Sequence, residues 1–162
     1  MTEARDLADV PNGIAVDSDG LVTKSSNPAF FVHKNATQTG SSGDVVSFQN
    51  VITNIGSHWD DTNHKFIAPV GATYMFCLNW LSNNGSDTQD CSIYKDGTAI
   101  MHSRQPNLSG IASVNHNTNN LAIAYYVSAS STIDVRLGAF VNNGSIYGDS
   151  NYWTTFSGFL IG

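Results

Sequence analysis

The densest group of potential metal ligands in the sequence lies in one short segment. It contains two histidines and two aspartates, His58, Asp60, Asp61 and His64. Imidazole nitrogens and carboxylate oxygens are ligands that Zn²⁺ and related ions accept. The spacing of the two histidines matches no known zinc site, and no further ligand closes the group. A hydrophilic loop is therefore the favoured interpretation of this segment, and metal binding is the weaker one.

No catalytic motif stands out in the sequence. Serine, histidine and aspartate are plentiful, but no Gly-x-Ser-x-Gly nucleophile elbow occurs. A pair of glutamic acids is impossible because Glu3 is the only glutamate, and no spacing singles out a pair of aspartates. We therefore expect that the protein is not an enzyme.

The charges argue against nucleic acid and anionic membranes as partners. Seven Lys and Arg residues against 13 Asp and Glu give a formal net charge of −6, and the cations are scattered along the chain. Phosphate backbones are bound by clustered cations. No apolar run approaches the roughly 20 residues of a membrane span, and the first residues lack the pattern of a signal peptide. Neither membrane insertion nor secretion is expected.

The two cysteines, Cys77 and Cys91, are expected to be free thiols. Cys77 lies in an apolar run and is typical of a small buried hydrophobic residue. A disulfide between adjoining strands is the alternative. Free thiols are consistent with assembly in the cytosol.

Composition and periodicity predict an all-β fold. Strong helix formers are scarce, and short runs of strand-forming residues alternate with turn clusters every 8 to 12 residues. We expect about ten antiparallel strands in a two-sheet jelly-roll sandwich. The expected strands are residues 29–34, 44–48, 51–55, 65–68, 73–81, 90–94, 98–102, 119–127, 132–140 and 153–161.

The first 28 residues differ from the rest of the chain. They contain no aromatic residue and two clusters of turn residues, at positions 11–13 and 17–20. We expect an N-terminal arm or anchor over residues 1–28 and a single β domain over residues 29–162.

Five segments, in order, resemble the globular head domain of complement C1q. The clearest are Phe-Ile-Ala-Pro-Val-Gly-Ala-Thr-Tyr-Met-Phe at 66–76 and Thr-Phe-Ser-Gly-Phe-Leu-Ile at 155–161. The other three lie at residues 46–56, 92–97 and 121–137. Departures from the family pattern, at residues 63–64, 72 and 130–132, fall at turns. The resemblance covers about residues 29–162.

This resemblance implies a jelly roll similar to tumour necrosis factor that assembles as a homotrimer about an apolar axis. It also implies a non-enzymatic domain that binds ligands through loops and subunit borders. No cofactor is expected, although Ca²⁺ is possible by analogy with some relatives.

Aromatic residues are the candidates for subunit and ligand contacts. An aromatic ring beside a loop can stack on a sugar ring or fill a pocket of a partner, and the polar loops 83–89, 104–117 and 142–151 can adapt their hydrogen bonds to a ligand. We expect ligand contact by Trp59, Tyr147 and Tyr152. The residues expected to pack in the trimer are Tyr74, Phe76, Tyr126, Trp153, Phe156 and Phe159.

The segment Ala-Arg-Asp-Leu-Ala-Asp-Val at 4–10 resembles short segments of structural proteins from tailed bacteriophages. This implies a virion protein, assembled in the host cytoplasm, whose arm is held by another virion protein through Arg5, Asp6, Leu7 and Val10. The favoured function is a trimeric module of a tail fibre or tail tip that attaches to a glycan or protein on the host surface. The alternatives are a capsid decoration anchored by the arm and a soluble carbohydrate-binding lectin.

Overall fold

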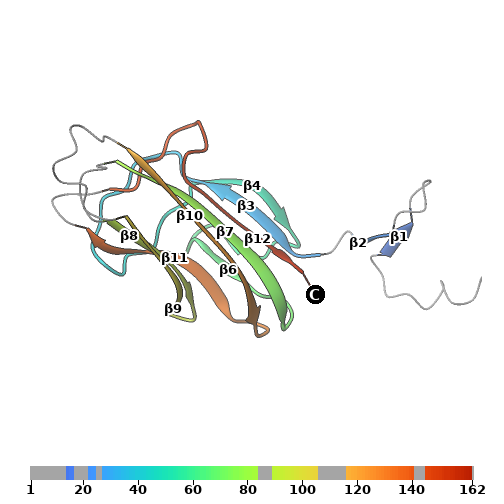
Figure 1. The fold of residues 1–162 in the computed structure, drawn as a ribbon. Helices are drawn as coiled ribbons and strands as arrows, with labels where there is room; N and C mark the ends of the chain where they lie inside the picture. The colour runs from blue at the N-terminus through green and yellow to red at the C-terminus, as the bar shows by residue number, and fades with distance from the viewer. Residues whose placement is uncertain are drawn as a thin grey trace, which may run out of the picture.

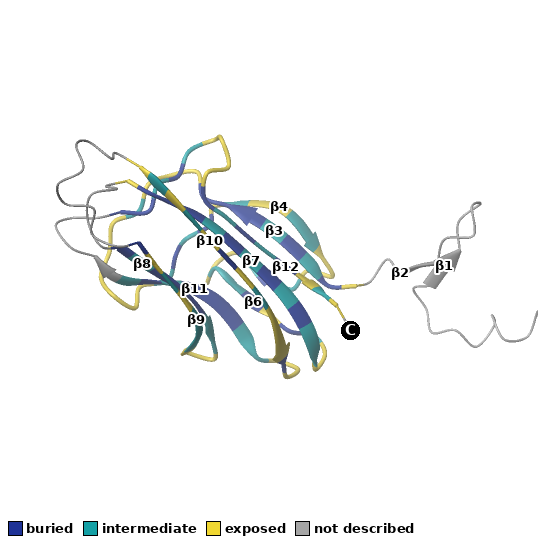
Figure 2. Cartoon of the chain, viewed as in Figure 1, coloured by how far each residue is buried: buried dark blue, intermediate teal, exposed yellow. Residues whose placement is uncertain are grey.

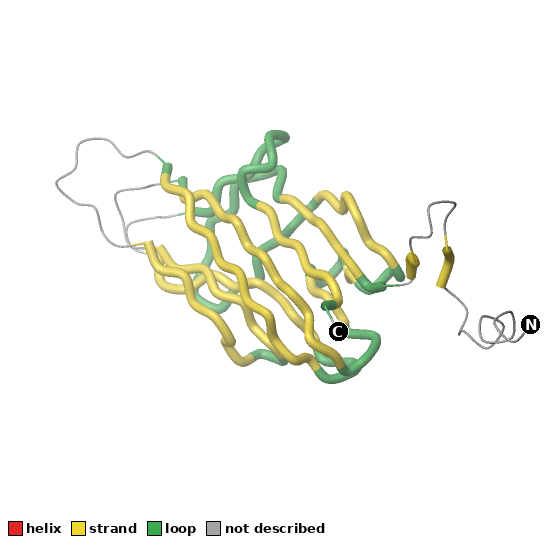
Figure 3. Tube along the Cα trace, turned by 45° about the vertical axis from the view of Figure 1, so that its right-hand side comes forward, coloured by secondary structure: helices red, strands yellow, loops and turns green. Residues whose placement is uncertain are grey.

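The computed structural model describes residues 27–83, 89–105, 116–140 and 145–161, and the backbone of residues 14–16 and 22–24. Within these ranges every regular element is a β-strand. Strands β3 to β12 form two five-stranded antiparallel sheets that face each other (Figures 1 and 3). The predicted two-sheet β sandwich is confirmed. In the N-terminal segment, β1 (Ile14–Val16) pairs with β2 (Val22–Lys24).

Each sheet joins strands that lie far apart in the sequence. The first sheet has the order β10 (Asn117–Val127), β7 (Ala72–Ser82), β12 (Thr155–Leu160), β3 (Ala29–His33) and β4 (Asn50–Ile55). The second has the order β5 (Trp59–Asp60), β6 (Lys65–Ile67), β11 (Thr132–Phe140), β8 (Gln89–Lys95) and β9 (Thr98–Gln105). The β12 strand therefore lies between β7 and β3.

The core fills the space between the two sheets. Along β7, the alternate side chains Tyr74, Phe76, Leu78 and Trp80 are buried, as the period of two predicts (Figure 2). Phe30 packs between the sheets, with its ring centroid 5.0 Å from that of Trp59 and 5.1 Å from those of Phe66 and Phe156. Aromatic rings thus account for much of the contact between the layers.

Two predicted segments differ from the structure. Residues 44–48 form no strand but an isolated bridge between Val45 and Arg136 of β11, made by the two backbone bonds Val46 N–H to Val135 O and Leu137 N–H to Asp44 O. Residues 59–60, predicted as loop, form the short strand β5. The Asn54 side chain stabilises β5 because its amide donates to the Trp59 carbonyl and accepts from the Trp59 N–H.

Both cysteines are free, as predicted. Cys77 lies on β7, where its side chain points away from the core, and Cys91 is buried on β8 of the other sheet. The two thiols are thus on different sheets, and burial raises the pKa of the Cys91 thiol.

Lys34 is a charged residue that is fully buried. Its ammonium group donates to Gln38 Oε1 at 2.9 Å, to the Ser47 carbonyl at 3.0 Å and to Ser47 Oγ at 3.1 Å. All three acceptors are neutral, so they compensate only part of the cost of removing the charge from water. Burial lowers the pKa of Lys34 from its usual 10.5 to about 8.

This burial predicts a stability that rises with pH. The unfolded chain keeps the Lys34 proton up to about pH 10.5, whereas the folded chain loses it from about pH 8. The unfolded state therefore binds more protons in this window, and the free energy of unfolding increases between pH 8 and pH 10. Urea denaturation across this range measures the increase, which we expect Lys34→Met to abolish. The partly exposed Lys65 gives the control, because Lys65→Met should retain the increase. An equal pH dependence in both variants would contradict the assignment.

Candidate functional site

The outer face of the first sheet carries an apolar region at one end. Strand pairing places Ile55, Ala29, Phe159, Met75 and Ala124 in one row across all five strands. Phe159 is 48% exposed. Tyr126 continues the region along β10 and is 61% exposed. These six residues are called the apolar half of the outer face.

The other end of the same face is polar. A row four residues further along the strands consists of His33, Thr155, Asn79 and Asn120. The face therefore changes from apolar to polar along the length of its strands.

The segment 145–154 is tied by hydrogen bonds to the polar end of β7. The Asn79 amide donates to the Trp153 carbonyl at 2.9 Å. Thr154 Oγ1 accepts from the Leu81 N–H at 3.1 Å and donates to the Tyr147 carbonyl at 2.7 Å, and the Tyr147 N–H donates to the Leu81 carbonyl at 2.8 Å. These bonds fix two aromatic residues beside the sheet.

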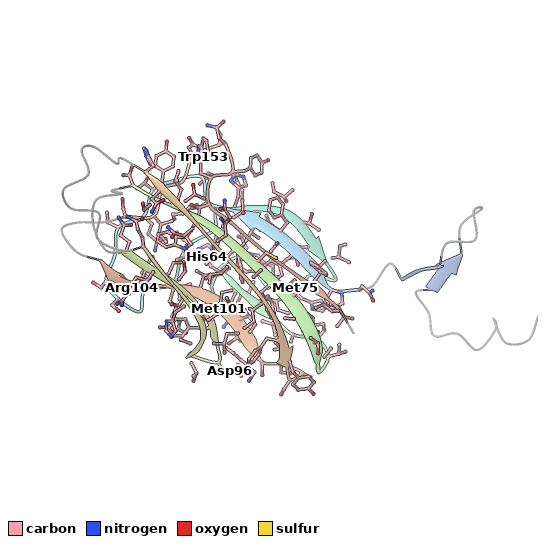
Figure 4. All side chains as sticks on the ribbon, viewed as in Figure 1. His64, Met75, Asp96, Met101, Arg104 and Trp153 are labelled. Atoms are coloured by element: carbon pink, nitrogen blue, oxygen red, sulfur yellow. The ribbon has the colours of Figure 1, made fainter. Side chains whose placement is uncertain are left out.

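A pocket of about 300 Å³ lies at this polar end. We call it the aromatic pocket, and its lining residues are Leu81, His116, Thr118, Tyr147 and Trp153. Figure 4 shows Trp153 at the opposite end of the sandwich from Asp96, in the β8–β9 turn. The Trp153 side chain is 47% exposed, so its ring is accessible to a ligand.

Asp149 orients the Tyr147 ring of the pocket. Its carboxylate accepts the Tyr147 hydroxyl at 3.1 Å and the backbone N–H of Asn151 at 2.6 Å. Hydrogen bonds from the Asn151 backbone and side chain and from the Tyr147 hydroxyl lower the pKa of Asp149. The His116 ring meets Tyr147 edge to face, with centroids 5.0 Å apart. The pocket is therefore preorganised around one carboxylate.

Tyr152 covers the neighbouring surface. Its ring centroid lies 4.1 Å from that of His33 and 6.4 Å from that of Phe31, to which it is nearly parallel. The backbone φ of Tyr152 is 61°, which is uncommon for a bulky residue. The surrounding contacts hold this strained conformation, a feature often found at binding sites.

Four predicted aromatic contacts are corrected by the structure. Tyr74, Phe76 and Phe156 have no exposed surface in the single chain, so their side chains cannot pack against another subunit. Trp59 is only 4% exposed because β5 turns it into the core, so it cannot contact a ligand. Of the residues predicted for trimer packing or ligand contact, five remain accessible: Tyr126, Tyr147, Tyr152, Trp153 and Phe159. The proposed anchor residues Arg5, Asp6, Leu7 and Val10 lie outside the described residues.

The segment with His58, Asp60, Asp61 and His64 consists of the short strand β5 and the turn at residues 61–64 that follows it. The Asp60 carboxylate accepts the backbone N–H groups of Thr62 and Asn63, both at 3.0 Å, and the Asn63 amide at 2.7 Å. The Asn63 bonds lower the pKa of Asp60. In the part of the chain that the structure describes, no three His, Cys, Asp or Glu side chains gather to hold a metal ion.

The structure brings together one serine and one histidine that the sequence did not single out. Ser92 Oγ lies 2.9 Å from His102 Nδ1, across the β8–β9 pair. Ser92 is also three residues before Lys95, the spacing of a serine–lysine nucleophile pair. However, these two side chains point to opposite faces of a strand, and Ser92 is buried. The Ser92 hydroxyl therefore links two strands and does not face a substrate.

Sequence comparison assigns the fold to a family. The model of the C1q domain matches residues 29–161. The chain belongs to the C1q domain family. A curated human relative, complement C1q tumor necrosis factor-related protein 3, is 26% identical over 133 residues, which are 81% of this chain and 50% of that protein. Its mouse counterpart is 27% identical over 135 residues, with the same coverage. The chain spans about half the length of these relatives.

Solved structures share the C1q fold at low sequence identity. The globular domain of zebrafish complement 1qA has a TM-score of 0.64 and 14% identity, over 83% of this chain and 98% of that one. The Eiger TNF of S. frugiperda has a TM-score of 0.69 and 12% identity, over 85% and 94%. Murine APRIL at pH 5.0 has a TM-score of 0.63 and 10% identity, over 83% and 99%. The predicted C1q and tumour necrosis factor fold is confirmed.

Two general properties follow from membership in the C1q family. Domains of this family are typically trimeric, and they are generally non-enzymatic. Among the described residues, no helix is long and apolar enough to cross a membrane.

Proposed function

We propose that this C1q domain is a non-enzymatic binding head that forms a homotrimer through the apolar half of the outer face. The observation that carries the proposal is the apolar row from Ile55 to Ala124 on the outer face of the first sheet. Phe159, in this row, is half exposed in the single chain, although the other face of the sheet is already buried in the core. Contiguous apolar surface of this kind is a mark of a contact with another protein.

The composition of the apolar half suits close packing between copies. Ala122 and Ala124 are exposed side by side with Cys77 and Met75 on the neighbouring strand. Small side chains on β10 allow another subunit to approach the backbone, while Tyr126 and Phe159 supply large apolar area. The neutral character of this face also avoids repulsion between subunits that each carry a formal charge of −6.

The polar end of the face is the side that supports ligand binding. It carries the aromatic pocket and Tyr152, which are held by Asn79, Thr154 and Asp149. The apolar end provides a surface for contacts between subunits, and the polar end provides groups that can adapt to a ligand. This division is consistent with a trimeric head that binds its ligand at the polar end.

The finer proposal places this head at a tail fibre or tail tip of a bacteriophage, where it attaches to the host surface. That setting is supported by the resemblance of residues 4–10 to phage structural proteins, whereas the curated relatives described above are animal proteins.

Deletion of residues 1–28 tests the anchoring arm. If the arm anchors the head, the truncated trimer no longer associates with particles; loss of cell binding alone contradicts anchoring. A capsid decoration and a soluble lectin are the alternative settings.

The mass of the purified protein in solution tests the homotrimer. We expect light scattering to give about 52 kDa, which corresponds to three chains of 17.4 kDa each. The mass should stay constant on dilution through the micromolar range. A mass of one chain at all concentrations would contradict the proposed assembly.

A further inference from the structure

We infer that the aromatic pocket binds a neutral pyranose ring of a glycan, with the indole of Trp153 as the stacking surface. This inference rests on the proposed function, since the pocket must stay open on the assembled head. It names the class of ligand that the polar end of the outer face would take.

The geometry of the pocket fits one sugar ring. Its volume of about 300 Å³ lies at the small end of the range for small-molecule sites. The lining combines aromatic surface from Trp153 and Tyr147 with polar groups from His116 and Thr118. A pyranose has the matching character, because it carries C–H groups on its flat faces and hydroxyl groups around its edge.

Trp153 differs from the other two tryptophans of the chain. Trp59 and Trp80 are buried in the core, whereas Trp153 is about half exposed and lines a pocket. The backbone of Trp153 is held in place, because its carbonyl accepts the Asn79 amide at 2.9 Å and the next residue, Thr154, is bonded to Leu81 and Tyr147. Little backbone freedom therefore remains to be lost when a ring stacks on the indole.

Asp149 favours an uncharged ligand. Its carboxylate accepts the hydroxyl of the pocket residue Tyr147, and hydrogen bonds hold the pKa of Asp149 below its usual value, so that the carboxylate is ionised at neutral pH. A fixed negative charge beside the pocket repels sulfated or carboxylated sugars. Among the described residues that line the pocket, none is a lysine or arginine that would offset this charge. Neutral hexoses and N-acetylhexosamines are thus the fitting class.

Tryptophan fluorescence of the full-length protein tests the inference, because Trp153 is the one accessible tryptophan. The probes are the methyl glycosides of glucose, galactose, mannose and N-acetylglucosamine, with N-acetylneuraminic acid as the anionic comparison. We expect at least one neutral glycoside to shift the emission and to protect Trp153 from acrylamide quenching. N-acetylneuraminic acid should do neither.

Point variants locate the binding site. Calorimetry measures the affinity of each variant for the neutral glycoside that the wild-type protein binds most tightly. We expect Trp153→Ala to weaken binding by about tenfold or more, as for a central aromatic contact, and Trp153→Phe to restore part of it. Asp149→Asn should weaken binding by a smaller factor, because it weakens the bond that orients the Tyr147 ring without removing either ring. Ile67→Ala is the control, since Ile67 is an exposed apolar residue of the second sheet, outside both the apolar half of the outer face and the aromatic pocket, and should leave glycoside affinity unchanged.

The outcomes separate this inference from the proposed assembly. A trimeric protein that binds none of the glycosides, or whose Trp153→Ala variant binds equally well, overturns the sugar site and leaves the trimer standing. A peptide that binds the pocket when no glycoside does would also overturn it. If Trp153 lies between subunits, acrylamide will not quench it in the trimer, and Trp153→Ala will lower the mass; that result overturns the inference as well. A monomeric wild-type protein contradicts the assembly instead.

Discussion

Replacement of Phe159 by aspartate is expected to convert the trimer into monomers of 17.4 kDa. Phe159 lies in the middle of the apolar row on β12 and is about half exposed in the single chain. In the trimer, the variant would bury an unpaired carboxylate from each subunit, and each such charge costs several kcal/mol, which opposes assembly. The mass by light scattering is the measurement.

The fold of the variant should be preserved, because the Phe159 side chain points away from the core. Circular dichroism should therefore remain that of a folded β protein. Ile67→Asp provides the matched control: Ile67 is an exposed apolar residue of the second sheet, so the same charge placed there should leave the trimer intact. A trimeric Phe159→Asp protein would contradict the assignment of the subunit contact.

Replacement of Phe156 by alanine is expected to destabilise the chain by about 3–5 kcal/mol, the usual cost of removing a buried phenylalanine. Phe156 is fully buried, and its ring centroid lies 5.1 Å from that of Phe30, 5.9 Å from that of Phe48 and 6.2 Å from that of Trp59. The variant would leave a cavity among these rings. Urea denaturation in the Phe159→Asp background measures the change without a contribution from trimer dissociation.

Ser157→Ala is the neighbouring control, because Ser157 points to the outer face and is only partly buried. We expect it to change the free energy of unfolding by less than about 0.5 kcal/mol. If Phe156→Ala cost no more than this control, the core position of Phe156 would be wrong.

The pair Phe156 and Phe159 shows what could and could not be predicted from sequence. Their separation of three residues places them on opposite faces of any strand, although both were expected in the trimer contact. The partner strands of β12, β3 and β7, determine which face of β12 meets the core. Phe156 pairs with their buried residues Val32 and Leu78. Those partners lie far away in the sequence. The Asp96-Gly97 hairpin, in contrast, was predictable because it is local, and both residues have the positive φ that such a turn requires.

The residues of the candidate site also divide into those that the sequence indicates and those that only the fold brings together. Tyr147, Tyr152 and Trp153 were noticeable as aromatic residues close to polar loops. The role of Asp149 was not, because it depends on the fold of the segment 145–154, which Thr154 and Leu81 fix by hydrogen bonds to β7. His116 joins the pocket only because β10 pairs with β7 along its whole length. The prediction for Trp59 was wrong because its segment was expected to be a loop. Hydrogen bonding to the Asn54 side chain stabilises a short strand there, and Trp59 is buried.

The position of β12 between β7 and β3 has a consequence for synthesis of the chain. On the ribosome, β12 emerges after all the other described strands, and until then β3 and β7 lack the neighbour that joins them. A nascent chain therefore carries two unsatisfied strand edges and an uncovered aromatic core, which are features that promote aggregation. Folding of this domain must therefore wait until β12 has been synthesised, and messages truncated before residue 155 should yield insoluble products.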